Sequence, residues 1–329
     1  MRDVAELAGV SLKTVSRVVN NEPGVTAALS YRVRVAIQTL GYQPDDRARF
    51  LRRGSATTRS IGFVQTDVAN PFFSSIFRGL ENVAQQRGFL VLAGSSNAEP
   101  DREQALIEAF IARRVDGLVI ASGQSNPSAL TTELKHGTPV VFVDIDPGLD
   151  TVDVVRSDHY GGAAIATRHL LEHGHERIAY LGDDSAFYSA NERRRAFVEV
   201  ITDAGHSAPW VLTDLTDPEL SAKATAELLT VAERPTALFT AQNFVTIGAV
   251  TALHRLGLQH RIALVGFDDV GFAELIEPQL TVVPQDPLRL GRLAGERLFA
   301  RLGSKNGSPE RYVVELAVVA RGSGEIRPS

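Results

Sequence analysis

The sequence contains no cysteine and no long apolar run. Without cysteine the chain can form no disulfide, no thiolate zinc site and no cysteine nucleophile. No stretch approaches the roughly 18 apolar residues that span a bilayer, and the N-terminus has neither the apolar core nor the small-residue cleavage site of a signal peptide. We therefore expect a cytoplasmic protein with no membrane contact.

Excess positive charge is confined to the N-terminus. The 329 residues carry a net charge of −5, yet residues 1–60 hold ten Lys and Arg against five Asp and Glu, which is +5 and leaves −10 for the remainder. A basic head on an acidic body indicates that the head alone meets phosphate, because counterion release rewards local positive charge. A chain of this length is also expected to form more than one folding unit.

The first 44 residues predict three short helices, at 3–8, 12–20 and 26–40. Gly9 allows a sharp turn after the first helix, and Ser11 and Thr26 can cap the second and third. Residues 45–59 are polar and rich in Arg, so we expect a linker with a helical turn or two. Apolar residues at helical spacing predict a small shared core, made of Val4, Leu7, Val10, Val15, Val18, Val33, Ile37 and Leu40.

From residue 60, short apolar strands alternate with amphipathic helices, which is typical of βαβ units and parallel sheets. The expected strands lie at 61–65, 90–93, 117–121 and 140–143, and then at 178–181, 210–212, 237–239 and 262–266. Two series of four strands predict two lobes, each a doubly wound parallel sheet. Such lobes bind ligands in a cleft outside the carboxyl ends of their strands.

The second helix has a polar face that suits the major groove of DNA. Lys13 and Arg17 can reach the acceptor edge of guanine, and Leu12 can meet a thymine methyl group. The hydroxyls of the same helix can position it against phosphates. The alternative interpretation is the exposed polar face of an ordinary helical hairpin.

Residues 3–20 closely resemble the DNA-binding head of the lactose-repressor (LacI/GalR) family. The remainder of the chain shows further similar segments, at Leu40-Gly41-Tyr42-Gln43-Pro44, Ala48-Arg49-Phe50-Leu51, Val115-Asp116-Gly117-Leu118, Val265-Gly266-Phe267-Asp268-Asp269 and Arg321-Gly322-Ser323. The resemblance implies a helix-turn-helix head at 1–44, a hinge helix and linker at 45–59, and an effector-binding core of the periplasmic-binding-protein type at 60–329. Within the core, lobe 1 is expected at about 60–158 and 287–315, and lobe 2 at about 159–286 and 316–329.

The resemblance also assigns DNA contacts. Bases would be met by Leu12, Lys13 and Arg17, and phosphates by Ser11, Thr14, Ser16 and Asn20. In the hinge helix, Ala48 and Arg49 would lie at the DNA, and Leu51 would be the apolar wedge that opens a base step in the minor groove. Alternatively, Leu51 rests on the body of the protein. The partner implied is a palindromic double-stranded operator bound by a homodimer that acts as a repressor.

For the effector cleft, the resemblance carries over nine positions, namely Asn70, Phe72, Phe73, Asp144, Ser189, Arg193, Asn243, Phe244 and Asp268. Carboxylates and an Arg fork can each satisfy adjacent hydroxyls, and aromatic faces can cover a sugar ring. The favoured effector is therefore a sugar. A purine or nucleoside and a protein partner stay open as alternatives, as do a core position for one of the two Phe residues and a purely capping role for Asn70.

No group of residues predicts catalysis, and we expect no enzyme, no cofactor and no metal site. Ser157, Asp158 and His159 are adjacent in sequence, which cannot produce the geometry of a catalytic triad. His169 and His173 have helical spacing but lack the Glu of a zinc-protease motif, so they are interpreted as ordinary surface histidines. A transport-type sugar-binding protein would share the two-lobed body, but it would carry an export signal and no basic head.

Overall fold

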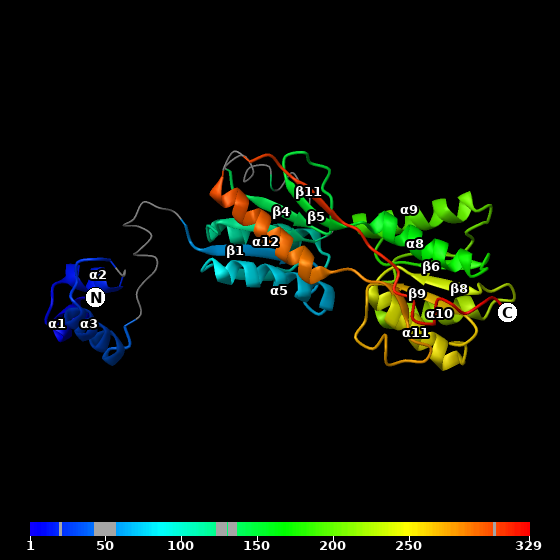
Figure 1. Ribbon diagram of the computed structural model, residues 1–329, viewed down its shortest axis with the longest axis horizontal. Coiled ribbons are helices and arrows are strands. Elements are labelled where there is room, and N and C mark those ends of the chain that lie inside the picture. Colours follow the sequence, from blue (N-terminus) through cyan, green and yellow to red (C-terminus); the bar gives the residue numbers. More distant parts are fainter. Residues whose placement is uncertain (20–21, 43–56, 123–129, 131–136, 305–306) are drawn as a thin grey trace. The chain divides into compact units, whose positions relative to one another are not determined.

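The computed structural model describes residues 1–19, 22–42, 57–122, 130, 137–304 and 307–329. The chain forms two compact units, Met1–Thr58 and Arg59–Ser329, each of which has its own core (Figure 1). Among the described helices, none combines the length and the apolar character that crossing a bilayer would require.

Three short helices pack together in the N-terminal unit: α1 (Arg2–Ala8), α2 (Leu12–Val19) and α3 (Ala27–Thr39). Gly9 ends α1 in the left-handed conformation with a φ of 59°, which favours glycine. Thr26 Oγ1 caps α3 by accepting a hydrogen bond from the Leu29 N–H at 3.4 Å. Arg32 Nη2 donates to the Ala8 carbonyl at 2.6 Å and so ties α3 to the end of α1.

The core of this unit differs in two members from the one that the sequence predicts. Its buried members are Val4, Ala5, Ala8, Val15, Val18, Val33 and Ala36. Leu7 and Leu40 are 55% and 46% exposed, so their predicted place in the core is wrong. A seven-residue helix buries only one narrow face, which in α1 is that of Val4 and Ala8, and Leu40 already lies beyond the last residue of α3.

In the second unit, lobe 1 is a six-stranded parallel sheet in the order β11-β5-β4-β3-β1-β2. Its strands are β1 (Ser60–Gln65), β2 (Leu90–Ser95), β3 (Gly117–Ala121), β4 (Val140–Val143), β5 (Asp153–Ser157) and β11 (Arg311–Val314). Its helices are α5 (Pro71–Gln86), α6 (Pro100–Ala112) and α12 (Pro287–Gly303).

Lobe 2 is a five-stranded parallel sheet in the order β10-β9-β8-β6-β7. Its strands are β6 (Ile178–Leu181), β7 (Val211–Leu212), β8 (Ala237–Thr240), β9 (Ala263–Phe267) and β10 (Thr281–Val283). Its helices are α8 (His159–Glu172), α9 (Tyr188–Asp203), α10 (Pro218–Leu229) and α11 (Asn243–Leu256). The predicted architecture, a small helical head and a core of two doubly wound parallel sheets, is confirmed.

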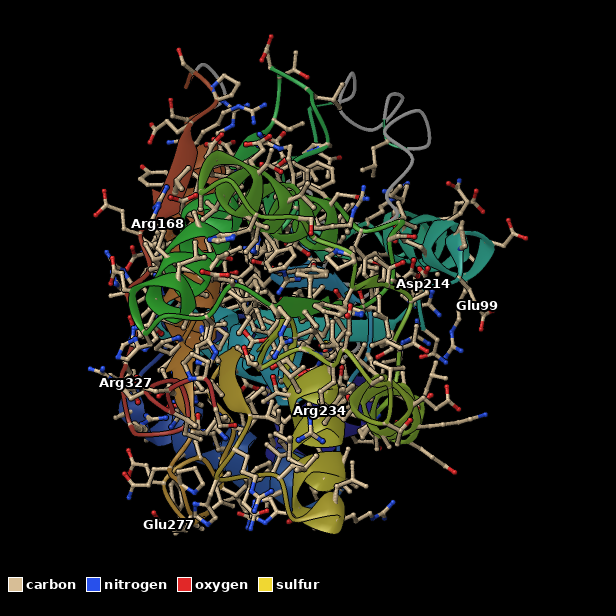
Figure 2. The ribbon with its side chains drawn as sticks, turned by 90° about the vertical axis from the view of Figure 1, so that its right-hand side faces the viewer. Glu99, Arg168, Asp214, Arg234, Glu277 and Arg327 are labelled. Atoms are coloured by element: carbon tan, nitrogen blue, oxygen red, sulfur yellow. The ribbon has the colours of Figure 1, made fainter. Side chains whose placement is uncertain are left out.

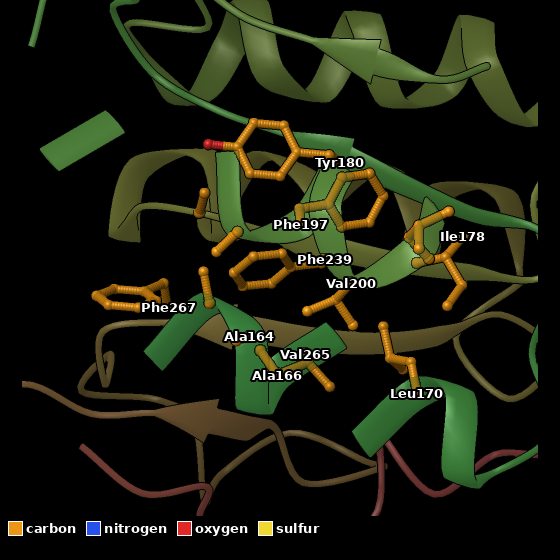
Figure 3. Close-up of a cluster of buried hydrophobic side chains, with 14 of the residues drawn as sticks. Ala164, Ala166, Leu170, Ile178, Tyr180, Phe197, Val200, Phe239, Val265 and Phe267 are labelled. Carbon is orange, nitrogen blue, oxygen red and sulfur yellow. The ribbon is translucent and has the colours of Figure 1, made fainter. Parts of the chain in front are cut away.

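Helices cover both faces of each sheet, because successive strand residues point to opposite sides. In β1, Ile61 and Phe63 pack against α5 and α12, whereas Val64 packs against α6. In lobe 2, α8 and α9 cover one face and α10 and α11 cover the other. Figure 3 shows the core on the α8 and α9 side, where the ring centroids of Tyr180 and Phe197 are 5.3 Å apart.

The sequence missed three strands, β5, β10 and β11, so the sheets have six and five strands instead of four each. β5 and β11 carry charged residues, and β10 is only three residues long. Helix α5 begins at Pro71, because Asn70 Oδ1 accepts a hydrogen bond from the Phe72 N–H at 3.0 Å and proline fits the first helical position.

The chain passes between the lobes at three places. These are the link from β5 to α8, the link from β10 to α12, and the segment after β11, where Leu316 and Val318 pack on lobe 2. Two lobes that are joined only by short connecting segments are suited to hinge motion about those segments.

Lobe 1 depends on the close approach of α5 and α12, which lie side by side in Figure 1. A Cβ atom added at Gly79 would lie 2.2 Å from the Leu288 carbonyl oxygen, and one added at Gly291 would lie 2.0 Å from the Ile76 carbonyl oxygen. The two glycines therefore allow the helix backbones to touch, and any side chain there would push the helices apart.

We expect Gly291→Ala to lower the free energy of unfolding by about 1–3 kcal/mol or more, because the new methyl group overpacks a backbone contact. The matched control is Gly303→Ala at the end of the same helix, where a Cβ meets nothing within 4 Å. This control should leave stability unchanged or raise it slightly. Urea denaturation of both variants measures the effect. Equal midpoints would show that the contact between α5 and α12 does not require glycine at position 291.

Candidate functional site

The start of α2 presents the side chains that the sequence assigns to DNA bases. Leu12 is 47% exposed and Lys13 is exposed too. Both line one surface depression together with Ser16, Met1 and Arg2. An apolar side chain and cationic side chains thus share a single surface, as contact with a thymine methyl group and a guanine edge would require.

Ser11 and Thr14 also build the helix that carries this face. Ser11 Oγ accepts a hydrogen bond from the Thr14 N–H at 3.2 Å, and the two hydroxyl oxygens are 3.0 Å apart. Ser11 therefore caps α2, as predicted. Arg17 is half-buried in the last turn. The other predicted DNA contacts lie outside the described residues, namely Asn20, Ala48, Arg49 and Leu51.

A cleft of about 410 Å³ lies between the two lobes. Eight of the nine predicted effector residues line it, of which Asn70, Phe72, Phe73 and Asp144 come from lobe 1, and Ser189, Arg193, Phe244 and Asp268 from lobe 2. Each lies just after a strand, at the N-cap of a helix or in the first two turns of a helix. The cleft is therefore built where parallel strands end, and it takes polar and aromatic groups from both lobes.

Asp144 and Asp268 hold equivalent places in the two lobes. Asp144 follows β4 and donates its N–H to the Val155 carbonyl at 2.9 Å, and Asp268 follows β9 and donates to the Val283 carbonyl at 3.0 Å. Their φ angles are 62° and 71°. A left-handed backbone costs a residue other than glycine about 1 kcal/mol or more. Here it bends the chain so that both residues line the cleft.

Arg193 is the cation of the cleft and is only 3% exposed. Its Nη2 lies 3.9 Å from Asp183 Oδ1, and its Nε donates to the Ser189 carbonyl at 3.1 Å. The guanidinium also lies 4.8 Å from the centroid of the Phe267 ring, in a cation–π contact. Arg193 is therefore fixed by the protein and needs no ligand to hold its position.

The carboxylates around Arg193 are buried enough to be hard to ionise. Burial raises the pKa of Asp183 to about 6, although Arg193 opposes the shift. Burial also raises the pKa of Asp268, against the effect of Arg193 and of a hydrogen bond donated by Gln285 Nε2 at 2.7 Å. Asp183 Oδ1 accepts no hydrogen bond from the described residues. These carboxylates can therefore accept hydrogen bonds from a ligand.

His159 lies beneath the cleft, fully buried. Its Nε2 is 3.0 Å from Asp144 Oδ1, a distance typical of an ion pair, although the ring is not aligned for a hydrogen bond. Asp158 instead caps α8 by accepting a hydrogen bond from the Gly161 N–H at 2.9 Å. Asp158 and His159 thus have different structural roles, and residues 157–159 do not form a catalytic triad.

Asn243, the ninth predicted effector residue, does not line the cleft. Its Nδ2 donates to Asn70 Oδ1 at 2.7 Å, and Asn70 Nδ2 lies 3.4 Å from Asn243 Oδ1. Both side chains are buried, at 5% and 6% exposure. Because Asn70 belongs to lobe 1 and Asn243 to lobe 2, this pair of amides joins the lobes directly.

Several cleft residues were not predicted, among them Asp67, Asp183, Phe187, Gln242 and Gln285. Asp183 could have been found, because it lies two residues after the end of β6, close to the place that Asp268 holds after β9. Gln285 could not, because it follows β10, a strand too short to be recognised in the sequence.

Comparisons with known proteins agree with this geometry. Residues 1–45 match the family described as bacterial regulatory proteins of the lacI family, and residues 167–324 match the periplasmic binding protein-like domain. The HTH-type transcriptional repressor PurR of Aliivibrio fischeri (strain MJ11) is 31% identical over 330 residues, which cover 98% of this chain and 97% of PurR.

Solved structures of similar fold contain the same two kinds of unit. The Lac repressor dimer bound to operator and the anti-inducer ONPF is 26% identical, with a TM-score of 0.86 over 98% of both chains. The complex of the transcriptional regulator CelR with cellobiose is 28% identical, with a TM-score of 0.73 over 98% of both chains. The chain therefore belongs to the LacI family of bacterial transcriptional regulators, in which the head binds operator DNA and the core binds the effector, and it is not an enzyme.

Proposed function

We propose that this regulator is a dimeric repressor of a palindromic operator, and that its effector is an uncharged, hydroxyl-rich molecule, a sugar. The main support for a sugar is the set of buried carboxylates around Arg193, namely those of Asp144, Asp183 and Asp268. Because the operator is chromosomal DNA, we place the protein in the cytoplasm.

The charge of the cleft argues against a phosphorylated effector. The described lining residues include the carboxylates of Asp67, Asp144, Asp183, Asp184 and Asp268, but only one guanidinium, that of Arg193. An anionic ligand would meet repulsion from this set, whereas hydroxyl groups can donate to carboxylates and accept from the Arg fork.

Aromatic residues supply an apolar surface for the ring of such a ligand. Phe72 and Phe73 meet edge to face, with centroids 5.3 Å apart, and Phe187 and Phe244 line the cleft from lobe 2. The cleft volume of about 410 Å³ is in the usual range for small-molecule sites. Aromatic faces can also stack on a purine, and this keeps a nucleoside as the second candidate.

The ligand contacts proposed here come from both lobes, so binding favours the arrangement in which the lobes are together. The Asn70–Asn243 pair also joins the lobes in this arrangement. An effector that fits this arrangement stabilises it further, and one that wedges the lobes apart breaks the amide pair. The sign of the response, induction or corepression, therefore follows from which arrangement the DNA-bound dimer prefers.

Fluorescence anisotropy of the full-length protein with DNA from its own upstream region tests the proposal. The protein is titrated with pentoses, hexoses, sugar phosphates, nucleosides and purines. We expect a neutral sugar to change operator affinity and its phosphate to have no effect. A response to purines alone would establish the second candidate, and a response only to an added protein would reject a small-molecule effector.

Lys13→Ala should reduce affinity for the operator by about 5- to 100-fold, because a side chain paired with a base edge contributes about 1–3 kcal/mol. Affinity for unrelated DNA should fall much less. Lys223→Ala on α10 is the control, since it removes the same charge from an exposed position in the other unit. Equal losses on operator and unrelated DNA would show that Lys13 contacts phosphate only.

Asp268→Asn should weaken binding of the identified sugar by about 10- to 100-fold, because it replaces a charge-assisted hydrogen bond by a neutral one. Asparagine tolerates the left-handed backbone, so the fold should persist. Asp214→Asn is the matched control, because Asp214 also has a positive φ, of 65°, but lies outside the cleft. Isothermal titration calorimetry measures both, and an unaltered affinity in Asp268→Asn would remove this residue from the site.

Sugar affinity should be constant well above pH 6 and should decrease as the pH falls through about 6. Hydroxyls donate to the ionised form of Asp183, and its pKa of about 6 means that acid removes this acceptor. The free energy of unfolding should change in the opposite direction and increase as the pH falls. The folded state retains the Asp183 proton up to about pH 6, whereas the unfolded state loses it near 3.8, so stability decreases as pH rises between these values.

Calorimetry and thermal unfolding at pH 5 to 8 measure both effects. In Asp183→Asn the step in affinity near pH 6 should disappear, and a step of the same size in this variant would assign it to another group.

A further inference from the structure

The C-terminal segment brings a carboxylate to the two histidines of α8. His169 and His173 are one turn apart, and Glu325 is 156 residues beyond His169 in sequence. His169 Nε2 lies 2.5 Å from Glu325 Oε1, and the two imidazole centroids are 4.5 Å apart. One ring nitrogen of each histidine and one carboxylate oxygen all lie within 4.8 Å of each other.

We propose that His169, His173 and Glu325 form a site for a divalent transition metal, with Zn²⁺ as the best match. Two imidazole nitrogens and one carboxylate oxygen are a ligand set that Zn²⁺ accepts, with water in the fourth tetrahedral position. The pair of histidines alone did not predict the site, because the third ligand arrives from the far end of the chain.

The tautomer of His173 is suited to metal binding. Its Nδ1 lies 2.7 Å from the backbone carbonyl of His169. A carbonyl oxygen only accepts, so Nδ1 carries the proton and Nε2 of the neutral ring keeps a free lone pair. Metal-bound histidines in proteins commonly make this same hydrogen bond from the other ring nitrogen, which fixes the ring and strengthens the ligand.

Glu325 is held in place for the same purpose. Its Oε2 accepts hydrogen bonds from Thr281 Oγ1 at 2.8 Å and from the Gly322 N–H at 2.5 Å, which leaves Oε1 directed at His169. His175 fixes the next residue, because its Nε2 is 2.7 Å from the Ile326 carbonyl. The carboxylate therefore does not need to be ordered by the metal, and this lowers the cost of binding.

In the metal-free protein, His169 donates its Nε2 proton to Glu325. Metal binding replaces this hydrogen bond by two metal–ligand bonds, and it requires His169 Nε2 to be free of its proton. A neutral ring meets this requirement by carrying its proton on Nδ1 instead, and an imidazolium ring by releasing its Nε2 proton to solvent. The side chains of His169 and Glu325 are 14% and 28% exposed, which admits an ion and its water. Arg168 and Arg327, which flank the site in sequence, are exposed and project into solvent (Figure 2).

Such a metal would cross-link the C-terminal segment to α8 and stabilise lobe 2. The test uses untagged full-length protein freed of metal with a chelator, then titrated with Zn²⁺ and, for a spectrum, with Co²⁺. We expect one equivalent of metal to bind, with the visible absorption of tetrahedral Co²⁺. A 100-fold excess of Zn²⁺ over its Kd should raise the Tm of metal-free protein by about 5 °C or more.

His173→Ala keeps the His169–Glu325 hydrogen bond but removes one ligand, and metal affinity should fall at least tenfold. Glu325→Gln, which keeps the size of the side chain, should weaken binding similarly. The control is His254→Ala, in the last turn of α11 of the same lobe. Absence of binding by the wild-type protein, or equal binding by His173→Ala and His254→Ala, would overturn the proposal and leave only a hydrogen bond between α8 and the C-terminal segment.

Discussion

All strands of a parallel sheet end at the same edge, so the residues that follow the strands gather at that edge. This constraint places the cleft between the lobes. Asp144 follows β4, Asp183 follows β6 and Asp268 follows β9, so three carboxylates from two sheets arrive at one cleft although 124 residues separate the first from the last. No special loop is needed, because strand direction alone gathers them, and the aromatic and amide groups come from the first turns of the following helices.

Bringing carboxylates together in a buried cleft lowers the free energy of unfolding. The other contacts of the cleft reduce this loss. Arg193 is fixed by the Ser189 carbonyl and by Phe267, and it faces the Asp183 carboxylate. Burial still raises the pKa of Asp183 and Asp268, so the charges are not fully compensated. We propose that a hydroxyl-bearing ligand reduces this residual cost, which would link ligand affinity to the arrangement in which the lobes are together.

The sequence predicts the architecture well, because strand and helix periodicities are local properties. It also predicts eight residues of the cleft, since the positions that follow buried strands can be recognised without knowing the pairing. The sequence predicts burial and side-chain contacts less well where these depend on residues that are distant in the chain. Leu7 has the apolar character of a core residue, but its neighbours leave it exposed. Asn243 pairs with Asn70 across the lobes, and Glu325 reaches His169 from the end of the chain, and neither contact is visible from spacing alone.

Lobe 1 is assembled from two distant stretches of the chain, because α12 and β11 follow the whole of lobe 2 in sequence. Ribosomes deliver the chain from its N-terminus. The face of the lobe 1 sheet that carries Ile61 and Phe63 therefore stays without the cover of Leu290 and Leu298 until α12 has been made. The strands of lobe 2 are complete before that point. During synthesis, the sheet begun first thus receives its last strand after the strands of lobe 2 have been made, and its apolar face stays exposed to water in the meantime.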